Sequence, residues 1–106
     1  MKLTIDRKRW LRGEGESNSF LLRTEDRKMC CLGIYGEACG VSRGDMASVT
    51  MPNPIRDNTE WPEWVLTGYA NSIALVNDDV HISEQERESQ LIELFSEHGV
   101  DVEFVG

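Results

Sequence analysis

The stretch SEQERESQLIELFSEHGVDVEFV, residues 83–105, carries a helix signal followed at once by a strand signal. Ser83 and Glu86 are spaced as a capping box, in which the serine side chain meets the amide three residues on and the glutamate reaches back to the cap. Gly99 is the residue type that ends a helix in a left-handed conformation. Residues 100–105 then alternate apolar with polar side chains, which is the period of a half-buried strand. The sequence therefore predicts a helix and then a strand in this stretch.

The rest of the chain adds strands before this stretch and two further helices. Turn residues at 13–19 separate two short segments with apolar side chains, which we expect to pair as a hairpin. Because strands and helices are grouped in the chain rather than alternating, we expect an α+β fold, a small, largely antiparallel sheet with two or three helices packed on one face. The predicted elements are, in chain order, strands at 1–6, 8–12 and 20–23, helices at 28–39, 71–77 and between Ser83 and Gly99, and a strand at 100–105.

The first predicted helix has recognisable ends and two unusual glycines. Thr24 or Asp26 is expected to cap it, and Gly40 is expected to end it. Gly33 and Gly36 each cost about 1 kcal/mol relative to alanine in a helix interior, so we expect another backbone to approach closely there. The expected buried stripe of this helix consists of Cys31, Ile34, Tyr35 and Ala38.

The 106 residues have the length of one domain, and we expect a single compact domain over residues 1–106. A long irregular loop is expected at about residues 41–64, where the three prolines of the chain fall. Loops of this length often carry function. Trp61 and Trp64 lie near its end, and the sequence leaves open whether they cover the core or form an exposed binding patch.

Charge is distributed unevenly along the chain. The net charge is −8, yet residues 1–28 carry eight basic against five acidic side chains, while residues 57–106 carry one basic side chain, Arg87, against twelve acidic ones. A chain with this net negative charge is expected to bind nucleic acid weakly, because affinity for phosphates requires neutralisation by lysine and arginine. Its acidic half instead favours a basic partner surface.

The N-terminal residues and the cysteine pattern indicate a cytoplasmic protein. The first ten residues carry charges where a signal peptide has its apolar stretch, and no apolar run approaches the ~20 residues of a membrane span. Cys30, Cys31 and Cys39 are an odd set without a C-x-x-C spacing, so reduced thiols are expected. We therefore expect a cytoplasmic protein that does not contact membranes.

Enzymatic and metal sites find little support. A nucleophilic thiol at Cys30 or Cys31, with His81 or His98 as base, would make a cysteine-dependent enzyme, but the apolar run around the two thiols favours buried structural residues. Cysteine and histidine spacings do not fit zinc. Five residues between positions 77 and 88 fall on the ligand positions of a calcium-binding loop, but Ile82 stands at the position where that loop requires glycine. We expect no catalytic residue, metal or cofactor; the calcium-loop positions are Asn77, Asp79, His81, Ser83 and Glu88.

Two clusters remain as candidate binding sites. The first is acidic and could mimic a phosphate array for a protein that binds nucleic acid, with the two tryptophans as further contacts. The second is basic and aromatic and could hold a nucleotide or small ligand, with the protein as an oligomer. Ordinary solvated side chains are the plainer interpretation of both. The acidic cluster consists of Asp78, Asp79, Glu84, Glu86, Glu88, Glu93 and Glu97 with Trp61 and Trp64, and the basic cluster consists of Arg7, Arg9, Trp10, Arg12 and Arg23.

Several phrases of the sequence, read together, resemble one family. They are RWLRGEG at 9–15, NSFLLR at 18–23, KMCCLGIY at 28–35, ACG at 38–40, NDD at 77–79, the glutamate-rich last helix and VEFV at 102–105. They are similar to a group of small uncharacterised proteins of bacteriophages and prophages, over nearly the whole chain. The resemblance implies an accessory role in infection, and accessory proteins of this size and acidity are often inhibitors of host defence or host enzymes.

Three functional hypotheses follow. The first is a non-enzymatic phage-type protein that binds and inhibits a host macromolecule, such as a CRISPR-type or other defence effector, through its acidic half and the tryptophan loop. The second is a protein that sequesters a nucleotide or small ligand through the basic cluster. The third is a cysteine-dependent enzyme, for which the resemblance supplies no catalytic residue.

Overall fold

The computed structural model describes residues 1–52 and 60–106, so Pro54 and the centre of the predicted irregular loop lie outside the described residues. Strands form the first and last described elements, and helices lie between them in the chain. In chain order the elements are β1 Lys2–Asp6, the 3₁₀ turn η1 Gly15–Ser17, α1 Cys31–Cys39, α2 Arg43–Met46, the 3₁₀ turn η2 Glu63–Leu66, α3 Tyr69–Asp78, α4 Glu84–Ser96 and β2 Asp101–Val105.

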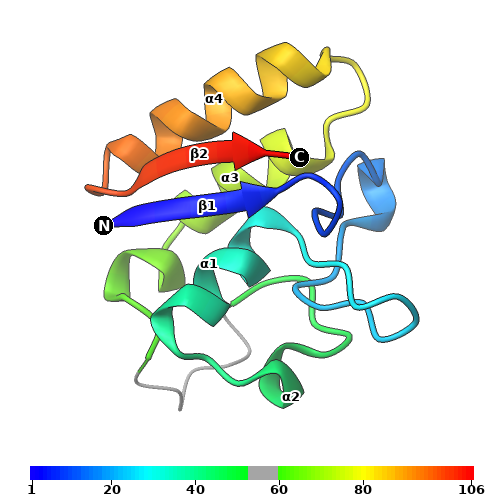
Figure 1. Cartoon of the computed structure of the whole chain (residues 1–106), viewed down its shortest axis with the longest axis vertical. Helices are drawn as coiled ribbons and strands as arrows, with labels where there is room; N and C mark the ends of the chain where they lie inside the picture. Colours follow the sequence, from blue (N-terminus) through cyan, green and yellow to red (C-terminus); the bar gives the residue numbers. More distant parts are fainter. Residues whose placement is uncertain (53–59) are drawn as a thin grey trace.

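The sheet contradicts the antiparallel expectation. β1 and β2 are its two strands in the described part of the chain, and they run parallel, with Leu3 opposite Val102 and Ile5 opposite Phe104. Figure 1 shows them side by side and pointing the same way. Parallel neighbours need a long crossover connection, and nearly the whole chain forms that crossover here. The fold is therefore a small α+β domain built on a two-stranded parallel sheet.

The predicted hairpin across residues 13–19 is also wrong, because its two segments pair with other parts of the chain. The first forms an isolated parallel bridge between Trp10 and Met29, and the second forms one between Leu22 and Ala47. The backbone groups of both segments find partners in these neighbours, so no ladder forms between the segments themselves.

One face of the sheet packs on helices. Leu3, Ile5 and Val102 are buried, and α1 packs on β1 while α4 packs on β2. Figure 1 shows α4 running along β2 and α3 passing behind the two strands. The opposite face is exposed and polar, and on it the Lys2 ammonium lies 3.0 Å from the Glu103 carboxylate. The alternation of side chains in both strands is thus the pattern of a sheet covered on one side.

The helix α1 begins later than predicted. Its cap is Cys30, and the Cys30 side chain makes no capping hydrogen bond. Neither Thr24 nor Asp26 caps it; the carboxylate of Asp26 accepts instead from the Lys28 amide at 3.1 Å and closes a turn. The end of the helix is as predicted, with Gly40 at a left-handed φ of 97°. Of the expected stripe, Cys31 and Tyr35 are buried, Ile34 is half-buried and Ala38 is exposed.

The two glycines of α1 do mark close approaches. A Cβ at Gly33 would lie 1.9 Å from the carbonyl oxygen of Leu21, which confirms the predicted backbone contact. At Gly36 the near neighbour is a side chain, since a Cβ there would lie 2.4 Å from the ring of Trp61. Both positions therefore exclude any larger residue without a shift of the neighbouring chain.

The helix α4 follows the sequence prediction closely. Ser83 Oγ accepts from the Glu86 amide at 3.1 Å, which is the first half of the capping box. The Glu86 carboxylate accepts from the Ser83 hydroxyl at 3.3 Å rather than from the cap amide. Leu91 and Phe95 are buried in the core, while Ile92 is exposed. Gly99 has the expected positive φ, at 74°.

Asn77, at the C-terminal end of α3, is 1% exposed and joins this helix to the N-terminal third of the chain. Its Oδ1 accepts from Trp10 Nε1 at 2.8 Å and from the Cys31 amide at 3.3 Å. Its Nδ2 donates to the carbonyl oxygen of Leu11 at 3.1 Å. One side chain thus satisfies two donors and one acceptor that come from two segments, Trp10–Leu11 and the start of α1 at Cys31.

Asp78 and Arg87 extend this contact into a network. The Asp78 carboxylate accepts from the Ser19 amide at 2.8 Å, from the Ser19 hydroxyl and from the Glu14 amide at 3.3 Å. The Arg87 guanidinium, 3% exposed, donates to three carbonyl oxygens at the end of α3, at 2.6–2.8 Å. We refer to Asn77, Asp78 and Arg87 as the polar cluster.

The Asn77→Ala variant tests the polar cluster. It leaves two buried donors and one buried acceptor without a partner, at about 1–3 kcal/mol each, so we expect the free energy of unfolding to fall by about 3 kcal/mol or more. Asn71→Ala, on the exposed side of the same helix, should change it by less than about 0.5 kcal/mol. Urea unfolding curves measure both, and similar values for the two variants would contradict the assignment.

Candidate functional site

The predicted acidic residues of α4 divide into two groups. Glu84 and Glu88 face the N-terminal segment and are neutralised there. Arg12 donates to Glu84 at 2.7 Å and Arg87 donates to it at 3.1 Å, while Arg7 binds Glu88 through two bonds of 2.8 and 2.7 Å. Burial opposes the charged form of Glu84, but the hydrogen bonds from the two arginines outweigh burial and lower its pKa. Within the described residues, these two carboxylates are paired with arginines of the same chain, unlike the remaining glutamates of α4.

The second group is exposed. Glu86, Glu93 and Glu97 form no ion pair with any residue in the described ranges. Together with the exposed Gln90 they follow the i, i+4, i+7, i+11 spacing of a single helix face. We refer to these four residues as the acidic stripe.

A groove lies beside the stripe, between α3 and α4. Its volume is about 430 Å³, and none of the described lysines or arginines lines it. Val76 and Leu94 give it an apolar part, and Glu93 and Glu97 give it negative charge. The groove can therefore take an aliphatic chain that ends in a cation. The residues of this α3–α4 groove are Ser72, Val76, Gln90, Glu93, Leu94 and Glu97.

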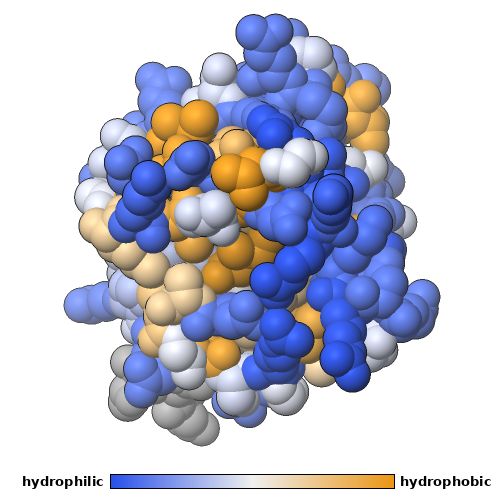
Figure 2. Space-filling view, in the orientation of Figure 1, coloured by the Kyte–Doolittle hydropathy of each residue, from blue (hydrophilic) through white to orange (hydrophobic). Residues whose placement is uncertain are grey.

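No family model, curated protein or solved structure matches the chain. The charge and shape of the surface are therefore the features of this chain that bear on its function. In Figure 2, apolar residues on the face shown gather in small separate patches among hydrophilic ones.

Asp78 and Asp79 do not join the acidic stripe of α4, with which they were expected to form one surface. Asp78 is buried in the polar cluster, where its oxygens accept hydrogen bonds from the N-terminal segment. Asp79 is half-buried in the turn after α3, and its Oδ1 accepts from the His81 amide at 2.8 Å. The first carboxylate is structural, because its charge is satisfied within the protein.

The tryptophans cover the core and do not form an exposed patch. Trp61 is 4% exposed and packs against Gly36 of α1. Trp64 is half-buried, and its ring stacks on the His98 imidazole with the ring centres 4.1 Å apart. Tyr69 meets the same imidazole edge-on at 4.6 Å. The expectation that Trp61 contacts a partner is therefore wrong.

The basic cluster is held within the fold, which weakens the ligand-binding alternative. Trp10 is buried with its indole N–H bonded to Asn77, and the Arg12 guanidinium lies 4.3 Å from the centre of the Trp10 ring. Arg12 and Arg7 hold the carboxylates of α4. A nucleotide base has no free aromatic face here on which to stack.

The other arginines of that cluster are paired as well. Arg9 lies 3.2 Å from the Glu37 carboxylate, which also binds Arg43 at 2.6 Å. Hydrogen bonds from these arginines, chiefly from Arg43, lower the pKa of Glu37. Arg23 binds Asp26 at 2.6 Å, and this hydrogen bond is the main cause that lowers the pKa of Asp26 to about 2. The arginines of the cluster thus neutralise carboxylates of the same chain.

In the part of the chain that the structure describes, no thiol is hydrogen-bonded to a histidine. Cys30 and Cys31 are fully buried, and neither His81 nor His98 is hydrogen-bonded to them. Burial raises the pKa of Cys30 to about 12 and that of Cys31 well above its usual range. Among residues 1–52 and 60–106, no group of side chains has the composition and proximity to bind a metal ion. None of the described helices has the length and apolar content for a membrane crossing.

Sequence reasoning missed the apolar half of the α3–α4 groove. Val76 and Leu94 come from different helices, so their juxtaposition requires the tertiary structure. Gln90 could have been found, because it lies four residues after Glu86 and three before Glu93 on the same helix face.

Thiol alkylation tests the burial of the cysteines. At about pH 8 a thiol with a pKa near 12 stays protonated, and the thiol is far less reactive than the thiolate. We expect iodoacetamide to leave Cys30 and Cys31 unmodified in the folded protein, to modify the half-buried Cys39 slowly, and to modify all three in denaturant, as read by mass spectrometry. Fast modification of Cys30 or Cys31 in the folded protein would revive the enzyme hypothesis.

Proposed function

We propose that this protein is a non-enzymatic binding protein that captures a basic surface of a partner protein through the acidic stripe and the α3–α4 groove. The observation that carries the proposal is the separation of charge around α4. Arginines of the N-terminal segment and Arg87 neutralise one side of the helix, and the opposite side keeps Glu86, Glu93 and Glu97 without a counter-ion in the described structure.

The stripe is held rigidly. The Ser83 cap fixes the start of α4, and Leu91 and Phe95 anchor the opposite helix face in the core. The backbone that carries the three carboxylates is already ordered, so binding of a partner has only their side chains left to order. Like charges at this spacing also attract a cationic surface from a distance, which raises the association rate at low salt.

The α3–α4 groove adds an apolar contact, which exposed charges alone do not provide. An exposed ion pair contributes only about 0–1 kcal/mol, so charge alone gives weak and poorly selective binding. Lysine or arginine of a partner can lay its aliphatic stem along Val76 and Leu94 while its cation meets Glu93 or Glu97. The groove therefore favours a cation carried on an aliphatic stem over a free metal ion.

Basic surfaces of this kind are typical of proteins that bind nucleic acid, and a bound acidic stripe would occupy the place of the phosphates. The resemblance to phage accessory proteins favours a host protein as the partner, including a defence effector. These two considerations support inhibition of the host protein by competition with its nucleic acid.

The double variant Glu93→Lys/Glu97→Lys tests the proposal. Immobilised wild-type protein should capture basic proteins from bacterial lysate at about 50 mM salt, release them at about 500 mM salt because the attraction is screened, and release them to added duplex DNA. The double variant should lose these proteins. Glu25→Lys/Glu63→Lys, with the same change of charge at exposed positions elsewhere, should keep them.

Mass spectrometry identifies the captured proteins, and circular dichroism checks that the variants fold. Equal capture by the two double variants would reject the stripe as the binding surface. Capture of acidic proteins that DNA does not release would reject the proposed mode of inhibition.

A further inference from the structure

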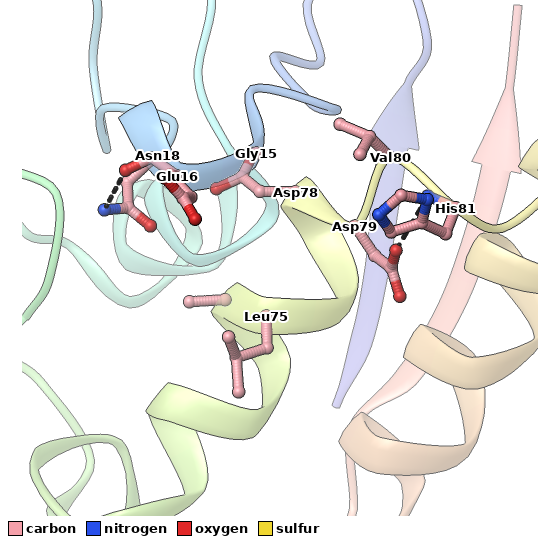
Figure 3. A pocket seen from close by; sticks show the side chains of 9 residues that line it. Gly15, Glu16, Asn18, Leu75, Asp78, Asp79, Val80 and His81 are labelled. Atoms are coloured by element: carbon pink, nitrogen blue, oxygen red, sulfur yellow. Dashed lines mark hydrogen bonds between the residues drawn. The ribbon is translucent and has the colours of Figure 1, made fainter.

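A second and larger hollow lies on a different face of α3, against the turn η1. Its volume is about 760 Å³, and Figure 3 shows it between the loop that carries Glu16 and Asn18, the helix side chain Leu75, and the turn that carries Asp79 and Val80. We propose that this η1–α3 groove is a docking site for a protein segment that carries a cationic side chain next to an aliphatic one.

The first observation is the exposure of apolar side chains in the groove. Leu75 is 72% exposed and Val80 is 59% exposed, and these are the two most exposed large apolar side chains in the described part of the chain. Both line this one hollow. Apolar side chains that gather at a hollow mark a contact surface, whereas single exposed ones do not.

The second observation is the charge of the lining. Glu16 stands on the η1 side and Asp79 on the opposite side, with Leu75 between them in Figure 3. Within residues 1–52 and 60–106, no lysine or arginine lines the groove. The Asp79 Oδ1 accepts from the His81 amide, and its second oxygen makes no hydrogen bond within the described residues. An apolar surface between two carboxylates complements an aliphatic side chain and a neighbouring cation.

The groove is preformed. Asp78, below its surface, accepts hydrogen bonds from the Glu14 and Ser19 amides, which tie both ends of the η1 loop to the end of α3. Asn18 Nδ2 donates to the Glu16 carbonyl oxygen at 3.2 Å and closes the loop on itself. A docking segment therefore meets a rigid wall on each side, which lowers the entropy cost of binding.

The negative charge of the groove favours a basic segment of a partner protein over a second copy of this chain. A second copy of this chain docking through the same face would bring Glu16 and Asp79 against their own equivalents, and the like charges would repel. A segment with arginine or lysine instead places its cation at a carboxylate and lays its aliphatic stem, or an adjacent leucine, on Leu75 and Val80. This site does not use the acidic stripe, so it stands or falls independently of the proposed function.

A peptide titration followed by NMR tests the docking site. The probe is an acetylated, amidated peptide Gly-Ser-Leu-Arg-Leu-Ser-Gly, with matched peptides in which glutamate replaces arginine or serine replaces both leucines. Added to ¹⁵N-labelled protein, the first peptide should shift the amides of Gly15, Asn18, Leu75 and Val80. The two matched peptides should shift them far less at equal concentration.

Variants separate the two parts of the interaction. Leu75→Ser and Glu16→Lys should each weaken the Kd of the first peptide by about tenfold, because the first removes an apolar contact and the second replaces an attraction with a repulsion. Ile92→Ser and Glu25→Lys make the same chemical changes at exposed positions outside the groove and should leave the Kd unchanged.

Several results would overturn the docking site. They are the absence of shifts up to a peptide concentration of about 10 mM, equal binding of the glutamate peptide, or an unchanged Kd for Leu75→Ser. Concentration-dependent shifts of the same amides without peptide would assign the groove to a second copy instead. Loss of peptide binding in Glu93→Lys/Glu97→Lys would place the peptide on the α3–α4 groove, whereas retained binding supports the η1–α3 site whatever the outcome for the proposed function.

Discussion

The hydrogen bonds of the polar cluster hold together a chain that has little regular structure in its N-terminal third. Between β1 and α1 the described chain has one 3₁₀ turn and two isolated bridges, so many backbone groups there must find partners elsewhere. Asn77 and Asp78 supply those partners to the backbone at Leu11, Glu14, Ser19 and Cys31, and Asn77 also accepts from the Trp10 indole. A buried network of this kind stabilises one arrangement only when every member is satisfied, and the contacts at the end of α3 meet that condition.

The same network explains the charge of the surface. Arg87 is the single basic residue between positions 57 and 106, and it is buried with its guanidinium on the carbonyl oxygens at the end of α3 and on Glu84. The remaining carboxylates of α4 depend on the arginines of the N-terminal segment for neutralisation. Arg7 and Arg12 reach one side of the helix, at Glu88 and Glu84, and the other side stays negative. The same arginine contacts therefore link α4 to the rest of the fold and leave its other side negatively charged.

The sequence predicted the elements whose signals are local. The Ser83 cap, the end of α1 at Gly40, the final strand and the close approach at Gly33 each depend on residues near one another in the chain or on a single glycine. Strand direction was wrong, because alternation of side chains gives the face of a strand but not the direction of its neighbour. The apparent hairpin failed for a similar reason, since its segments bond to Met29 and Ala47, whose positions depend on the whole fold.

The candidate site was predictable only in part. Glu93 and Glu97 lie on the surface as expected, but the burial of Asp78 depends on Ser19, which is 59 residues away in the chain. Trp61 is buried because Gly36 leaves room for its ring, and no local pattern records that contact. Charge patterns in a sequence therefore identify where carboxylates cluster, while the structure decides which of them are neutralised.

Native-state hydrogen exchange of the Trp10 indole and of the Ser19 and Cys31 amides tests most directly whether the polar cluster holds the fold together. If it does, these three protons exchange only when the whole protein unfolds, with the same free energy as the slowest amides of α4. Exchange of the three protons through a local opening, at a free energy well below that of the α4 amides, would show that the N-terminal segment detaches while the rest stays folded, and would contradict the account.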